Sequence, residues 1–99
     1  MAVRTDLRLE VVSRKDEILA LAREHGAHNL SVRFPRYDFY DMPEVEFLAD
    51  MDKDSSLLDR ANLLGELSDL LGVQAMVFNR ESLPPDFAQS LSADALILG

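Results

Sequence analysis

Apolar residues recur with a helical period along the segment SRKDEILALAREHGA, residues 13–27. This spacing predicts an amphipathic helix with one buried stripe. Ser13 with Asp16 predicts a capping box at its start, and Gly26 suits the position after its end. The residues on the predicted stripe are Ile18, Leu21, Ala22 and His25.

The preceding segment TDLRLEVV, residues 5–12, fits two patterns. Leu7 and Val11 continue the helical stripe upstream, whereas Leu7, Leu9 and Val11 alternate as in a strand. We predict a helix here, because its apolar residues then share a face with those that follow.

Two short strands are predicted in the middle of the chain. Residues 29–34 alternate in polarity, with Leu30, Val32 and Phe34 apolar, and EVEFLAD at 44–50 is the second strand. The connection at 35–43 is bounded by prolines. It is too short for the helical crossover that parallel strands need, so the two strands should pair antiparallel.

The clearest helix is predicted within residues 51–72, with Gly72 at its end. Asp54, Ser55 or Ser56 can cap its start. VQAMVF at 73–78 is the third predicted strand. The strand–helix–strand order implies a right-handed parallel crossover. The apolar face expected for the helix consists of Leu57, Leu58, Ala61, Leu64, Leu67 and Leu71.

A last helix is predicted in SLPPDFAQSL, residues 82–91, because proline suits the first turn of a helix. The predicted fold is therefore a small α/β (α+β) domain spanning residues 1–99. Three or four helices pack on a three-stranded mixed sheet whose central strand is 44–50. The expected core centres on Leu21, Val45, Phe47, Leu64, Leu67 and Val77.

The charge balance narrows the classes of partner. Ten basic residues stand against eighteen acidic ones, a formal net charge of −8. DNA binding normally requires clustered Lys and Arg, so we expect no DNA partner. An acidic surface suits a basic protein partner, or serves solubility alone. With no cysteine, no apolar leader and no long apolar run, we expect a cytoplasmic protein without membrane contact.

The order of these segments resembles the minimal nucleotidyltransferases of the DNA polymerase β-like superfamily. These are small prokaryotic proteins often encoded beside a HEPN-domain partner. ILALAREHGAHNL at 18–30 is similar to their first helix and the entry to their first strand. EVEFLAD lies where the family carries Asp-x-Asp, SLLDRANLLGELSDLLGV at 56–73 is similar to their second helix, and FNRESLPPDFAQSL at 78–91 resembles their C-terminal turn and helix.

The resemblance implies a nucleotidyltransferase-like fold but altered chemistry. In the family, a Gly-Ser turn followed by Ala-Arg-Gly, an Asp-x-Asp pair and a third Asp present nucleotide phosphates to two magnesium ions. Here the Gly-Ser turn falls near Phe34 and Pro35, and the third Asp falls on Met76. Proline has no N–H to offer a phosphate, and a thioether is a poor ligand for a hard ion.

Glu44 and Glu46 take the place of the Asp-x-Asp pair. On a strand, residues two apart face the same side, roughly 6.5–7 Å from each other. The pair therefore has a spacing suited to a metal ion, on the face opposite Val45, Phe47 and Ala49. Glutamate is one methylene longer than aspartate, however, and Mg²⁺ tolerates misplaced ligands poorly. The pair is equally typical of the solvated face of a strand.

The sequence gives weaker support for functional roles of other side chains. Arg33 and Arg36 could contact a nucleotide, although surface solvation or a salt bridge to Asp38 or Asp41 explains them as well. Histidines at 25 and 28 suit helix-end or surface roles better than a metal site. Tyr37, Phe39 and Tyr40 could stack a base, contact a partner or cover the end of the sheet.

Three functions are compatible with these residues. The favoured one is a catalytically degenerate, partner-binding protein without cofactor, antitoxin-like beside a HEPN-type protein. The second is an active Mg²⁺-dependent nucleotidyltransferase that uses Glu44 and Glu46 with a third acid such as Asp50 or Asp38. The third is a structural or oligomerisation subunit of a larger enzyme. The oligomeric state, the partner and any nucleotide are left open.

Overall fold

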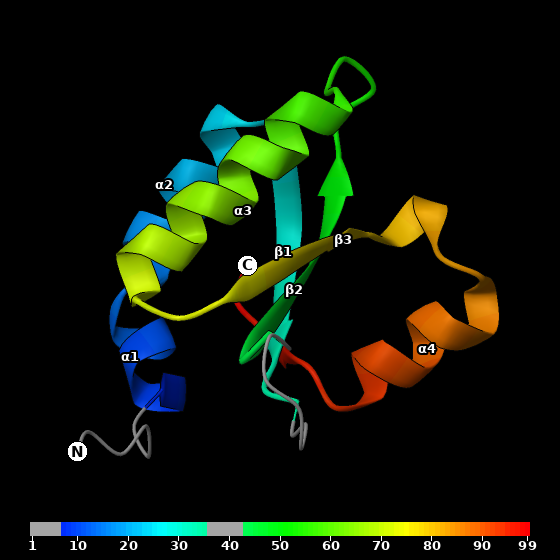
Figure 1. Ribbon diagram of the computed structural model, residues 1–99. Coiled ribbons are helices and arrows are strands. Elements are labelled where there is room, and N and C mark those ends of the chain that lie inside the picture. The colour runs from blue at the N-terminus through cyan, green and yellow to red at the C-terminus, as the bar shows by residue number, and fades with distance from the viewer. Residues whose placement is uncertain (1–6, 36–42) are drawn as a thin grey trace.

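The computed structural model describes residues 7–35 and 43–99 and confirms a mixed α/β architecture (Figure 1). The elements in chain order are α1 (Leu7–Ser13), α2 (Lys15–Glu24), β1 (Ala27–Arg33), β2 (Val45–Met51), α3 (Leu57–Leu71), β3 (Ala75–Asn79), the 3-10 turn η1 (Arg80–Ser82), α4 (Pro85–Ala93) and β4 (Leu96–Ile97). None of the helices in these ranges is long and apolar enough to cross a membrane.

The sheet has the order β3-β2-β1-β4. β2 pairs antiparallel with β1 and parallel with β3, which confirms the predicted central position of β2. The predicted strand count was wrong, since β4 adds a fourth strand antiparallel to β1. β4 contains only two residues, Leu96 and Ile97, and so short an apolar segment has no period from which a strand could be recognised.

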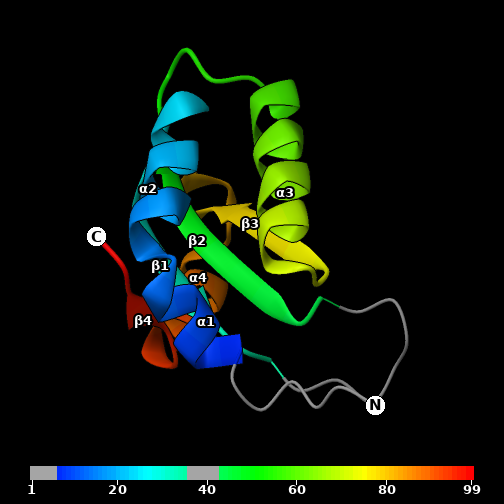
Figure 2. The same ribbon diagram turned by 90° about the vertical axis from the view of Figure 1, so that its left-hand side faces the viewer.

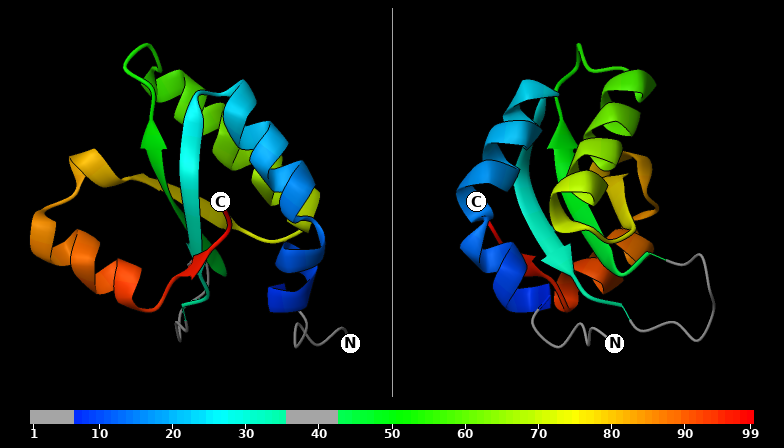
Figure 3. Two further views of the ribbon diagram at one scale, coloured as in Figure 1. Left: turned by 180° about the vertical axis from the view of Figure 1, so that it is seen from behind. Right: turned by 60° about the vertical axis from the view of Figure 1, so that its left-hand side comes forward.

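The two faces of the sheet are covered by different helices. α1, α2 and α3 lie on one face, and α4 lies apart from them on the other (Figures 1 and 3). Figure 2 shows α2 and α3 side by side over the sheet. The crossover from β2 through α3 to the parallel strand β3 places α3 there.

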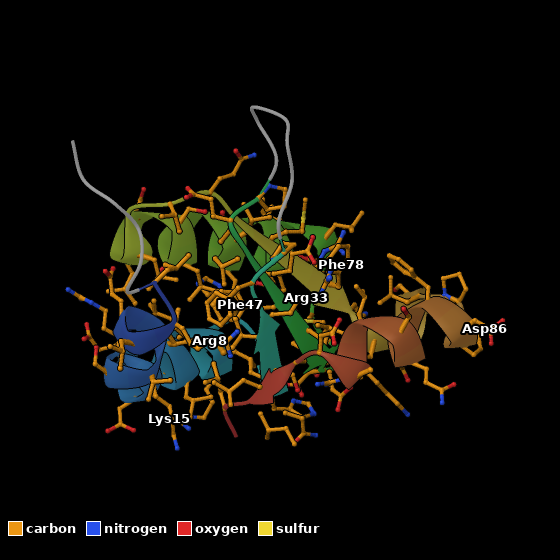
Figure 4. All side chains as sticks on the ribbon, turned by 90° about the horizontal axis from the view of Figure 1, so that it is seen from below. Arg8, Lys15, Arg33, Phe47, Phe78 and Asp86 are labelled. Atoms are coloured by element: carbon orange, nitrogen blue, oxygen red, sulfur yellow. The ribbon has the colours of Figure 1, made fainter. Side chains whose placement is uncertain are left out.

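The main hydrophobic core lies between the sheet and helices α1 to α3. Val45, Phe47 and Ala49 of β2 are fully buried in it, so the predicted core face of this strand is confirmed. Figure 4 shows Phe47 between α2 and α3. Leu67 and Val77 are buried as expected, whereas the predicted core residues Leu21 and Leu64 are only partly buried against the cluster.

The first helical segment is interrupted rather than continuous. α1 ends at Ser13 and α2 begins at Lys15, but Leu7 and Val11 are buried with Ile18 as the helical stripe predicts. The predicted capping box of Ser13 and Asp16 is wrong. The Ser13 hydroxyl donates to the carbonyl oxygen of Glu10 instead, because α1 already occupies the residues before it.

The predicted boundaries of α3 agree with its capping geometry. Ser56 is the N-cap and forms a capping box with Asp59, and Gly72 closes the helix in the left-handed conformation with φ of 68°. The predicted inward face was partly wrong. Leu63, Leu67 and Leu71 are buried, while Leu57, Leu58 and Ala61 are exposed. The leucines of α3 surround the whole helix, so their pattern does not define one face.

Candidate functional site

The face of the sheet opposite the main core carries a partly buried ion pair between neighbouring strands. Arg33 on β1 lies opposite Glu46 on β2 in the antiparallel register. Arg33 Nη1 donates to Glu46 Oε1 over 2.6 Å. The Glu46 side chain is 5% exposed and that of Arg33 is 22% exposed. A charge-assisted hydrogen bond this short, at a site with little water, compensates for the burial of the carboxylate.

This geometry changes the interpretation of the Glu44 and Glu46 pair. Glu46 faces away from the main core as predicted, but it is not solvated. Glu44 precedes β2 and is exposed, and its backbone N–H donates to the carbonyl oxygen of Gln74. Of the two alternatives left open for this pair, a solvated face fits Glu44 but not Glu46, to which Arg33 supplies a counter-charge from the next strand.

The residues around Glu46 do not fit a divalent metal ion. Met76 on β3 lies opposite Glu46 in the parallel register, so a thioether occupies that neighbouring position. The Arg33 guanidinium already contacts the Glu46 carboxylate, and Arg33 Nε is a buried donor without an acceptor among the described residues. Across residues 7–35 and 43–99, no three His, Cys, Asp or Glu side chains are grouped to hold a metal.

A second polar cluster lies further along the same face. Asp50 accepts hydrogen bonds from Asn29 Nδ2 at 2.9 Å and from Arg80 Nη1 at 3.2 Å. Arg80 Nη2 also donates to the Ser31 hydroxyl at 3.0 Å. Asn29 adopts φ of 54° beside a register shift in β1, a conformation that Asn accepts more readily than most residues. The hydrogen bonds of Arg80 thus connect η1 to the central strands β1 and β2.

These contacts lower the pKa of Asp50 below its ordinary value of 3.8. The hydrogen bond from Asn29 is the largest cause, and the hydrogen bond and charge of Arg80 add to it. Burial opposes the shift but is outweighed. Asp50 is therefore ionised and hydrogen-bonded within the fold. It lies four residues from Glu46 on one strand, about 13 Å away, so the two acids do not share an ion.

The segment where the resemblance places a Gly-Ser turn is occupied by Phe34 and Pro35. The guanidinium carbon of Arg8 lies 4.8 Å from the centre of the Phe34 ring, a cation–π contact that connects α1 to the end of β1. A bulky ring held by a helix leaves less room for a phosphate than the glycine of the family motif.

The two histidines make separate contacts. His25 is the C-cap residue of α2, as predicted, and its ring contacts the Glu66 carboxylate of α3. His28 Nδ1 lies 3.2 Å from Asp52 Oδ1 on the surface. These are helix-end and surface roles. The remaining candidates fall outside the described residues: Arg36, Tyr37, Asp38, Phe39, Tyr40 and Asp41.

Sequence reasoning missed the polar partners on this face. It considered Arg33 and Glu46 separately, and it did not consider Asn29, Ser31 or Arg80. One signal could have identified the first pair. Residues of opposite charge near the two ends of a connection between antiparallel strands come to lie opposite each other.

Comparisons with known proteins support this fold. The sequence matches no protein-family model and no curated protein. Two solved structures are similar. A candidate minimal nucleotidyltransferase is 25% identical, with a TM-score of 0.73 over 96% of this chain and 98% of that one. The second, with a TM-score of 0.66 and 16% identity, comes from a mutant of the toxin–antitoxin MntA-HpeT.

The second similarity covers 86% of this chain and 71% of the other. In that mutant, two aspartates two positions apart are replaced by glutamates. The first similarity extends over nearly the full length of both chains and agrees with the order of segments described above. The chain has the fold of the minimal nucleotidyltransferases.

Proposed function

We propose that this chain is a catalytically degenerate nucleotidyltransferase-like protein that acts by binding a protein partner. The observation that carries the proposal is the partly buried ion pair of Arg33 with Glu46. The fold implies that acids on β2 hold magnesium, and here a guanidinium contacts the better placed of the two acids. A metal ion would have to displace a charge-assisted hydrogen bond at a largely buried carboxylate.

The other expected parts of the catalytic site support the same proposal. Met76 lies in register with Glu46, and Phe34 stands where the resemblance places the Gly-Ser turn that would bind a phosphate. Two-metal phosphoryl transfer requires several oxygen ligands that hold both ions roughly 3.5–4 Å apart. Since the described residues supply no such set, we derive no reaction step through magnesium.

The proposed biological role is antitoxin-like, with a HEPN-type toxin as the partner. One structural neighbour belongs to a toxin–antitoxin pair, and its mutant carries glutamates with the same two-residue spacing as Glu44 and Glu46. A net charge of −8 would steer a basic partner towards this chain. The role requires association in the cytoplasm and no cofactor.

Co-expression with the protein encoded by the adjacent reading frame tests this role. That protein should arrest growth when expressed alone, and this chain should bind it and restore growth. A variant with Glu44→Gln and Glu46→Gln should restore growth equally, because glutamine can still accept a hydrogen bond from Arg33. Loss of rescue by a variant that still binds would instead favour the alternative, an active Mg²⁺-dependent enzyme.

A further inference from the structure

We propose that the exposed side of α3, together with β3, is the docking site for a basic amphipathic helix of the partner protein. This inference rests on the partner-binding function proposed above and assigns it to a surface. The site, called here the α3–β3 groove, is lined by Leu57, Arg60, Ala61, Leu64, Met76 and Phe78.

The α3–β3 groove is an apolar depression outside the main core. It holds a hollow of about 350 Å³. A second hollow of about 230 Å³ adjoins it and shares Leu57 and Arg60 as lining residues. Leu57 is 76% exposed and Leu58 is 68% exposed. Leu57 lines both hollows, and Leu58 follows it on α3 without lining either, so Leu57 and the adjacent Leu58 offer anchoring positions for apolar side chains.

The burial of the β3 backbone indicates whether the partner binds as a helix or as a strand. β3 is an edge strand of the sheet, so the partner could instead add a strand of its own alongside β3. However, Ala75 and Val77 are each only 2% exposed, and the N–H of Ala75 already donates to the Ser68 hydroxyl of α3. At Ala75 and Val77, the backbone of this edge is therefore covered. A helix, whose own backbone is satisfied, fits this surface.

Charge indicates the chemistry of the occupant. The chain carries a net charge of −8, so a second copy would be repelled and a basic partner attracted. Exposed acids precede two residues that line the second hollow, Asp54 before Ser55 and Glu81 before Ser82. Arg60 lines both hollows and makes no ion pair with the described residues, so it can accommodate one carboxylate of the otherwise basic helix.

The chain offers a matched control for the α3–β3 groove. Leu9 and Val12 on α1 are also exposed, at 67% and 47%, and they lie at the opposite end of the molecule from the start of α3 (Figure 2). Replacing Leu57 and Leu58 with Ser should weaken binding of the adjacent-frame protein at least tenfold, with an unchanged melting temperature. Replacing Leu9 and Val12 with Ser should leave the affinity unchanged.

A site-specific probe gives a second readout. The chain has no cysteine, so Leu58→Cys or Val12→Cys provides one position for a fluorophore. The adjacent-frame protein should change the emission of the label at 58 and not at 12. Raising the salt from about 50 to 500 mM should slow association at least tenfold, because screening removes electrostatic steering.

The outcomes separate the two proposals. Binding that survives the Leu57 and Leu58 replacements would overturn the docking surface and leave the partner-binding function standing. No binding by the parent chain would overturn both. Self-association of the parent chain that these replacements abolish would show a second copy in the groove and overturn the basic helix. Tight binding of an acidic or strand-forming segment in the α3–β3 groove would also overturn the basic helix.

Discussion

The two faces of the sheet use the same strands in opposite ways. Through Val45, Phe47 and Ala49, β2 contributes to a dry apolar core beneath α1 to α3. Two residues of the same strand on its other face, Glu46 and Asp50, are each bonded to an arginine. The apolar face accounts for the fold, whereas the polar face holds charges that are costly to bury and are retained only with partners.

The comparison teaches where function should be sought in this chain. The resemblance to the minimal nucleotidyltransferases implies acids on this face that bind metal and nucleotide. Here Arg33 and Arg80 satisfy acids on that face. A surface whose charges are already paired has less capacity to bind an ion, which supports the proposed partner-binding function.

The largest expected effect comes from the apolar face. Replacing Phe47 with Ala should lower the free energy of unfolding by about 3–5 kcal/mol, because the ring is fully buried and its loss leaves a cavity. Urea denaturation followed by circular dichroism measures the change. A loss below about 1 kcal/mol would mean that the faces of β2 are exchanged.

The polar face should respond differently to single and double replacements. Arg33→Met should cost about 3 kcal/mol, towards the lower end for broken buried pairs because this side chain is partly exposed. Combining it with Glu46→Leu should restore much of the loss, since neither charge of this pair remains. A double variant as unstable as the sum of both single variants would show that the pair is not coupled.

These contrasts explain what the sequence could and could not predict. Ser56 and Gly72 define the ends of α3 through local chemistry, which is visible in the residues themselves. The exposed side of α3 was mispredicted because Leu57 and Leu63 are both leucines. Only the packing of α3 on the sheet makes Leu57 exposed and Leu63 buried. The pairing of Glu46 with Arg33 depends on strand register, which one chain segment alone does not specify.

A pH titration should distinguish Asp50 from ordinary surface acids. Because its pKa is lowered in the folded state, Asp50 stabilises the protein above its unfolded pKa of about 3.8. That contribution is lost as the pH falls through the lower folded value. The melting temperatures of the parent and an Asp50→Asn variant should therefore differ at pH 6 and converge as the pH falls below the ordinary value of 3.8. A difference that grows on acidification would contradict the assignment.

The smallest effect on stability is expected at Leu58, next to the α3–β3 groove residue Leu57. Leu58→Ser should change the free energy of unfolding by less than about 0.5 kcal/mol, because this side chain is 68% exposed. Thermal and urea denaturation measure it. A loss above 1 kcal/mol would indicate that Leu58 supports the fold instead of remaining available to a partner.

The central claim is that the Arg33 guanidinium takes the place of a metal ion at Glu46. Paramagnetic broadening by Mn²⁺ tests it directly, because the NMR signals of the amides nearest a bound Mn²⁺ ion disappear first. At equimolar Mn²⁺, the amide signals of Val45, Glu46 and Met76 should broaden no more than those of surface acids elsewhere in the chain. Selective loss of these three signals, abolished by Glu46→Gln, would contradict the account and restore an active metal-dependent nucleotidyltransferase.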